Sequence, residues 1–170
     1  MRFRCVAVVA AIVAAVFAGT ASAKLTAAEQ KWASPLIQAW NLQNAGLHLV
    51  LAQASRNGAL VAGEKPDNLN LTRTLVVLAS CRTGKVIAKA GKPPTARMAG
   101  FRDALNAACI HDANGANDFA EAIGAVTKNN ATRAKAFLAQ GVQEFKKGSD
   151  QIREAYSALT AIGGGAVFKA

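Results

Sequence analysis

The chain has 170 residues, 52% of them hydrophobic, and a formal net charge of +10 at pH 7. This length suits one domain rather than several. The excess of positive charge bears on solubility and on partners, not on fold. It directs attention to anionic partners such as lipid head groups, acidic wall polymers, nucleic acid and acidic proteins.

The first 23 residues follow the three-part plan of a secretory signal peptide. Arg2 and Arg4 precede an apolar run over 5–18, and the small residues at 21–23 offer a cleavage site. The run is too short for a membrane-spanning helix, which needs about 20 residues. We therefore expect cleavage after Ala23 and a secreted or periplasmic mature chain with 18 cations against 10 carboxylates, a net charge of +8.

Two cysteines remain in the mature chain, Cys81 and Cys109. Cysteines in an oxidising compartment most often pair, and no His, Asp or Glu stands at ligand spacing from either one. We predict a disulfide between them that stabilises the fold by ~3–4 kcal/mol. The alternatives are a metal pair and a reactive thiol.

Apolar residues recur at spacings of three and four along the chain, which is typical of helices, and alternation typical of strands is nowhere sustained. A first helix begins at the capping box formed by Thr26 and Glu29 and ends near Asn57. We expect Pro35 to kink or restart this helix, because proline removes a backbone hydrogen bond.

The second helix, which follows a loop over 57–66, ends either near Gly84 or near Gly91. In a tight hairpin of parallel helices, Cys81 and Cys109 would be offset by ~8–9 Å along the axis, too far for a disulfide. We therefore expect the second helix to end near Gly84. The basic run after it is then partly an extended loop.

Thr95 opens a third helix, and the polar stretch over 111–118 is predicted to be a loop by its composition. A shorter helix follows from Asp118. A break at Asn129 leads to a last long helix that ends near Gly163.

These elements predict an all-α protein, an up-and-down bundle of four main helices in up to five segments, held by one disulfide. The predicted organisation is a signal peptide over 1–23, a single helical domain over 24–162 and a flexible tail over 163–170.

The last predicted helix carries a row of small residues spaced seven apart: Ala134, Gly141, Gly148 and Ala155. Glycine inside a helix costs ~1 kcal/mol relative to alanine, so two glycines in register need a packing reason. The row predicts either close approach of another helix or a groove that holds a ligand.

A second feature is a run of cations: Arg82, Lys85, Lys89, Lys92 and Arg97. No carboxylate occurs between residues 68 and 102. The run predicts a binding surface for an anionic polymer or lipid, and the alternative is an ordinary solvated helix face. Aromatic residues that would stack on bases are missing from it, and no nucleic-acid motif is present, so we expect no nucleic-acid partner.

Motifs for catalysis and cofactors are missing from the sequence. No serine sits in a nucleophile elbow and no cysteine has an obvious base. A haem attachment motif is absent, and the spacing of His111, Asp112 and Asp118 fits no known metal-binding loop.

We therefore expect a non-enzymatic, exported or envelope-associated protein without metal or cofactor, whose basic flank binds an anionic partner. The alternatives are a carrier of a small apolar ligand or cofactor in the bundle interior, and an enzyme that carries no recognisable motif.

Overall fold

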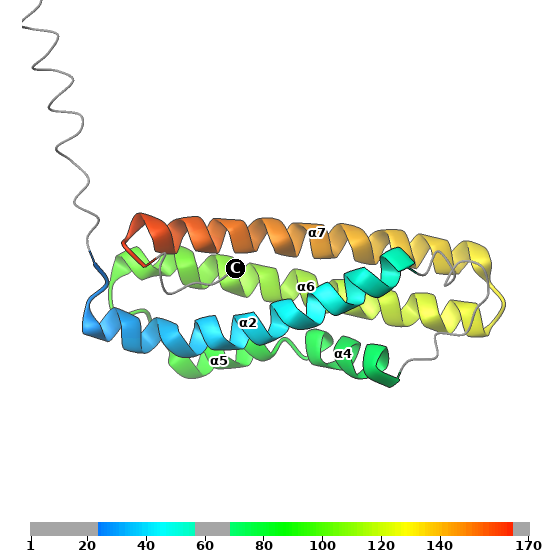
Figure 1. Ribbon diagram of the computed structural model, residues 1–170, viewed down its shortest axis with the longest axis horizontal. Coiled ribbons are helices and arrows are strands. Elements are labelled where there is room, and N and C mark those ends of the chain that lie inside the picture. Colours follow the sequence, from blue (N-terminus) through cyan, green and yellow to red (C-terminus); the bar gives the residue numbers. More distant parts are fainter. Residues whose placement is uncertain (1–23, 57–68, 165–170) are drawn as a thin grey trace, which may run out of the picture.

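The computed structural model describes residues 24–56 and 69–164, which form an all-α bundle (Figure 1). The helices are α2 (Ala27–Arg56), α4 (Leu69–Ala79), α5 (Arg82–Ala90), the short 3-10 helix η1 (Ala96–Met98), α6 (Ala99–Thr127) and α7 (Ala131–Ala161). α6 and α7 run side by side, and α4 and α5 lie end to end along α2. The predicted four-helix bundle is confirmed, with α4 and α5 together as its second helix. The predicted signal peptide and the predicted loop over 57–66 lie outside the described residues.

Two clusters of buried side chains fill the bundle. The first joins α2 to one end of the α6–α7 pair through Trp40, Phe101 and Leu159. The second joins α2 and α4 to the middle of that pair and contains Leu47, Leu78, Phe119 and Phe145. Each such side chain contributes ~1.5–3 kcal/mol on burial, so these clusters are the main force holding the helices together.

α2 starts as predicted, because Thr26 and Glu29 form the capping box: the Thr26 backbone N–H donates to Glu29 Oε2 at 2.8 Å. Pro35, however, does not restart the helix, which continues to Arg56. Lys31, whose carbonyl loses its helical partner, and Pro35 are both exposed, so water can satisfy that carbonyl. The Ser34 hydroxyl donates to the Gln30 carbonyl instead of capping a new helix.

The second helix breaks at Cys81. α4 ends at Ala79, and Cys81 has a left-handed backbone conformation with φ 43°. Cys81 is bonded to Cys109 across a Cα–Cα distance of 5.4 Å, which confirms the disulfide. The helix thus ends even before Gly84. The basic run after the break, predicted as partly extended, is helical over Arg82–Ala90, where α5 lies, and non-helical over 91–95, which includes Lys92.

The predicted loop over 111–118 is wrong, because α6 continues through it to Thr127. Asp112, Gly115, Ala116 and Phe119 are all buried there. Their spacing of three and four extends the apolar stripe of α6, and contact with α7 outweighs the weak helix preference of Asn, Asp and Gly.

The row of small residues on α7 lies buried against α6. A Cβ atom built on Gly141 would lie 2.5 Å from the Phe119 ring, and one on Gly115 would lie 2.8 Å from the Phe145 ring. A Cβ on Gly148 would collide with Asp112. The row therefore serves close helix packing. Where a ligand groove would lie beside Gly141 and Gly148, the Phe119 ring and Asp112 fill the space.

The predicted flexible tail begins too early, because Gly163 and Gly164 complete the end of α7. The Gly164 N–H donates to the Leu159 carbonyl at 2.8 Å and the Gly163 N–H to the Thr160 carbonyl at 2.9 Å. With Gly163 at φ 84°, this is a Schellman cap. Residues 165–170 lie outside the described residues.

Gly148→Leu should lower the free energy of unfolding by ~3 kcal/mol, because the new side chain overlaps Asp112 at the α6–α7 contact. Chemical denaturation of the mature protein measures this change.

The matched control is Gly124→Leu on α6, where an added Cβ meets nothing within 4 Å. Leucine is a better helix former than glycine, so this variant should gain up to ~1 kcal/mol. Equal effects of the two variants would contradict the close packing at Gly148.

Candidate functional site

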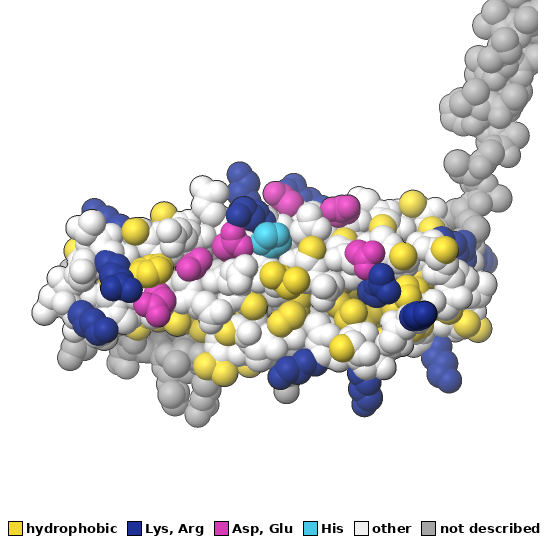
Figure 2. Space-filling view, turned by 180° about the vertical axis from the view of Figure 1, so that it is seen from behind, with side chains coloured by type: hydrophobic (Ala, Val, Ile, Leu, Met, Phe, Trp, Pro, Cys, Tyr) yellow, Lys and Arg dark blue, Asp and Glu magenta, His cyan; other side chains and the backbone are white. Residues whose placement is uncertain are grey.

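α5 has a buried side and a cationic side. Thr83 and Ile87 are buried in the bundle, whereas Lys85 and Lys89 are exposed one turn apart. The chain then leaves the helix through Gly91, at φ 69°, and Lys92 is exposed next to it. Figure 2 shows Lys and Arg side chains projecting from the lower edge of the molecule, on the side of α5, below the Asp and Glu side chains of that face. Three of the predicted cations, Lys85, Lys89 and Lys92, are therefore exposed to solvent.

These three lysines, Lys85, Lys89 and Lys92, form no ion pair within the part of the chain that the structure describes. Asp103, which lines the same groove as Lys92, pairs with Arg102. Glu121 pairs with Arg133, Glu144 with Lys147 and Asp150 with Arg153. The side chain of Arg82 is not among those described. We define Lys85, Lys89 and Lys92 as the lysine flank.

Arg97, which was predicted to bind an anionic partner with the other cations, is instead bound to Glu29. Its Nε donates to Glu29 Oε1 at 2.7 Å and its Nη2 to Glu29 Oε2 at 2.5 Å. The Thr95 hydroxyl also donates to Glu29. These bonds, that from Arg97 foremost, hold the pKa of the buried Glu29 far below its usual range. Arg97 thus fastens the η1 turn to the start of α2 and lies outside the lysine flank.

A shallow groove of about 530 Å³ runs between α5 and α6, next to the lysine flank. Gly84, Ala88 and Gly91 form its wall on α5, and Arg102 and Asn106 belong to its α6 side. The groove exists because three small residues follow one another along that side of α5. Arg102 is paired there with Asp103, so the groove contains both signs of charge.

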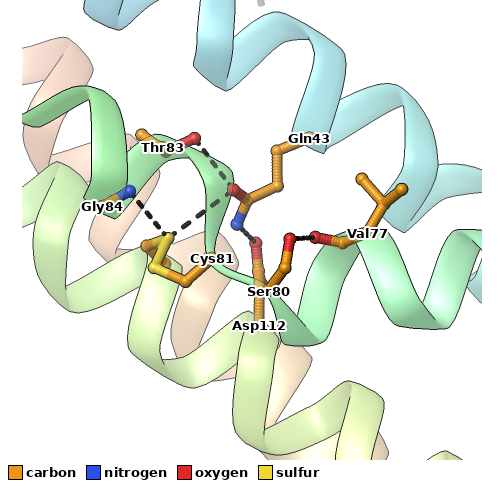
Figure 3. The surroundings of a disulfide bond; sticks show 8 residues. Gln43, Val77, Ser80, Cys81, Thr83, Gly84 and Asp112 are labelled. Carbon is orange, nitrogen blue, oxygen red and sulfur yellow. Dashed lines mark hydrogen bonds between the residues drawn. A yellow bond between two sulfur atoms is a disulfide. The ribbon is translucent and has the colours of Figure 1, made fainter.

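A buried polar cluster surrounds the disulfide (Figure 3). Gln43 from α2 accepts a hydrogen bond from the Thr83 hydroxyl at 2.8 Å and donates one to Asp112 Oδ2 at 2.9 Å. The Gly84 backbone N–H donates to Cys109 Sγ at 3.2 Å. Three helices, α2, α5 and α6, therefore meet through polar groups at the point where α4 ends.

Asp112 is the least satisfied member of this cluster. It is completely buried, and its Oδ1 has no hydrogen-bond partner among the residues that the structure describes. Burial raises the pKa of Asp112 from 3.8 to about 6, against the opposing effects of the Gln43 hydrogen bond and nearby His111. The ionised form is thus costly in the folded protein.

His111, Asp112 and Asp118, whose spacing fitted no metal-binding loop, also have separate surroundings in the structure. His111 Nδ1 lies 2.8 Å from Glu144 Oε2, and this bond, with one from Lys147, lowers the pKa of Glu144 to about 2. Asp112 faces Gln43 instead, and Asp118 is half-buried on the next turns of α6. Among the described residues, no three His, Cys, Asp or Glu side chains gather as a metal site would require. None of the described helices is long and apolar enough to cross a membrane.

Sequence analysis missed the polar cluster, although a signal existed. The buried residues of α2 follow spacings of four and three at Leu36, Trp40, Gln43, Leu47 and Val50. Gln43 is the one polar residue in that series, and a polar residue at a core position needs a buried partner. The identity of the partners depended on how the helices pack.

Asp112→Asn should raise the free energy of unfolding at about pH 7, by up to ~3 kcal/mol, because asparagine needs no ionisation in the core. The folded-state pKa of Asp112 is raised, so its stabilising effect is present at low pH and lost as pH rises through about 6. The advantage of the variant should therefore shrink between about pH 6 and pH 4. Denaturation of both proteins across this range measures it.

The pKa values of Glu29 and Glu144 are lowered, whereas that of Asp112 is raised. Because both proteins contain Glu29 and Glu144, the difference between their free energies of unfolding at each pH reports on Asp112 alone. Each of these two groups has a lowered pKa and stabilises the fold above its unfolded pKa, with loss on acidification. A variant whose stability runs parallel to that of the wild type at every pH would contradict the assignment.

Comparison with known proteins identifies no relative: no family model, no curated protein and no solved structure matches the chain. The chemistry of the site must therefore be read from its own side chains.

Proposed function

We propose that this chain is an exported, non-catalytic binding protein of the cell envelope, whose lysine flank docks on an anionic lipid surface. The observation that carries the proposal is the exposure of Lys85, Lys89 and Lys92 with no carboxylate paired to them in the described residues. Cations that are not neutralised within the protein remain available to a partner.

The shape of the flank favours an extended surface over a small ion. Lys85 and Lys89 stand on the rigid helix α5, and Lys92 follows directly after its end. The flexible side chains of three lysines can meet several head groups at once. The neighbouring arginines whose side chains the structure describes, Arg97 and Arg102, are paired with Glu29 and Asp103. Each lysine close to an anionic membrane contributes about 1 kcal/mol.

The ion pairs elsewhere in the bundle support the same proposal. Of the carboxylates on α6 and α7, Asp103, Glu121, Glu144 and Asp150 are paired with cations of those helices, and Glu29 is paired with Arg97. The net charge of +8 on the predicted mature chain adds a long-range attraction to the local one.

The test is binding of the mature protein to vesicles. Vesicles that contain phosphatidylglycerol should bind it at low salt, and physiological salt should weaken binding steeply, because screening acts on exposed charges. Vesicles of phosphatidylcholine alone should not bind. Preference for a soluble polyanion over the vesicles would assign the flank to an acidic polymer instead.

The variant Lys85→Gln, Lys89→Gln, Lys92→Gln should weaken binding to the anionic vesicles by roughly 100-fold, since three contributions of about 1 kcal/mol are lost. The matched control is Lys128→Gln, Lys135→Gln, Lys146→Gln, which removes the same charge at exposed positions away from α5. The control should lose less than tenfold. Equal losses in both variants would mean that net charge alone binds, and the flank would have no special role.

A further inference from the structure

The disulfide has hydrogen-bonding groups beside its buried sulfur that a purely structural disulfide does not need. Cys109 is completely buried, and its sulfur accepts a hydrogen bond from the Gly84 N–H at 3.2 Å (Figure 3). Gln43 Oε1 lies 3.6 Å from the same sulfur. A disulfide sulfur carries no proton, so this oxygen has nothing to accept from Cys109 while the bond is intact.

Reduction would make use of both groups. The thiol form of Cys109 can donate its proton to Gln43 Oε1, and the thiolate form can accept from the Gly84 N–H. Asp112 accepts from Gln43 Nε2 and so fixes the orientation in which the Gln43 oxygen faces Thr83 and Cys109. The reduced state thus finds its hydrogen-bond partners without any movement of the helices.

The other sulfur is within reach of the surface. Cys81 is partly exposed, unlike Cys109. Gly84 lines the groove between α5 and α6, and a Cβ atom on Gly84 would lie only 2.7 Å from Cys81 Sγ. Neither cysteine lines the groove itself, and Gly84, which has no side chain, is the groove residue that lies against Cys81 Sγ.

We propose that Cys81–Cys109 is a redox-active disulfide that oxidises a dithiol approaching the partly exposed Cys81 beside Gly84, where the α5–α6 groove ends. A thiolate of the dithiol attacks Cys81 Sγ, forming a mixed disulfide, and the electron pair of the broken bond passes to Cys109 Sγ. The second thiolate of the dithiol then attacks its own bonded sulfur and releases Cys81. Two electrons and two protons pass from the dithiol to the two cysteines, and the dithiol leaves as a disulfide.

Cys81 is also placed to be a good leaving group in the second step. It is the N-cap residue of the nine-residue helix α5, and the first turn of that helix contains no acidic residue. Backbone N–H groups at a helix start favour a thiolate over a thiol. The groove, the sulfur contacts and this helix start therefore point to the same bond.

The rate of reduction of the folded, mature protein by dithiothreitol tests the proposal. Reduction is measured without vesicles, so its result is separate from whether the lysine flank binds an anionic lipid surface. We expect a rate proportional to the reductant concentration and unchanged by low, non-denaturing urea. A rate that reaches a plateau at the speed of global unfolding and rises with urea would show that only the unfolded chain is reduced, and the proposal would be wrong.

Two pairs of variants locate the attack. Ala88→Phe places a ring in the groove and should slow the reduction roughly tenfold, whereas Ala139→Phe, at an exposed position on α7, should leave the rate unchanged. With oxidised glutathione, Cys109→Ser should form a mixed disulfide at Cys81 roughly tenfold faster than Cys81→Ser forms one at the buried Cys109. Equal rates within either pair would refute this approach to Cys81. If the single-cysteine variants do not fold, the alanine pair decides.

Discussion

The bond between Cys81 and Cys109 is the constraint on which the rest of the structure depends. A left-handed residue in the middle of a helical segment is unfavourable for any residue with a Cβ, and Cys81 holds this conformation where its sulfur meets α6. The break separates α4 from α5, which starts at Arg82. The lysine flank, the groove beside Gly84 and the contact of the Gly84 N–H with Cys109 all follow from that new start.

The distribution of charge is a second consequence of the packing. Positive charge runs along much of the chain, but the fold divides the cations into two kinds. Arg97 is locked against the buried Glu29 and serves to fasten the end of the bundle. The lysines of α5 and its following turn have no such partner among the described residues. A cation has to be unpaired before it can bind anything else, so this division, more than the net charge, defines the candidate surface.

The tight pairing of α6 with α7 and the polar cluster beside the disulfide are coupled through Asp112. One oxygen of its carboxylate contacts Gln43, and the other is directed at Gly148 of α7. A larger residue than glycine would have no room there. The small-residue row thus does more than shorten the distance between two helices, because it also makes space for a buried carboxyl group next to the cysteines.

The sequence alone determined the helical class, the bundle, the cysteine pair and the capping box at Glu29. These follow from local spacing, from cap chemistry and from the presence of two cysteines after the predicted signal peptide, none of which needs the position of a distant residue. It was misleading wherever local preference met tertiary contact. The polar stretch over 111–118 has a loop-like composition, yet burial of Ala116 and Phe119 against α7 makes it helix.

Tertiary structure alone decided which charges are neutralised and which polar groups are buried together. Glu29 and Arg97 are far apart in the chain, as are Gln43, Thr83 and Asp112, and no spacing rule relates residues on different helices. Their association depends on how the helices cross, which is set by the summed shape of the side chains between them. For that reason the candidate cations were visible in the sequence, but their availability was not.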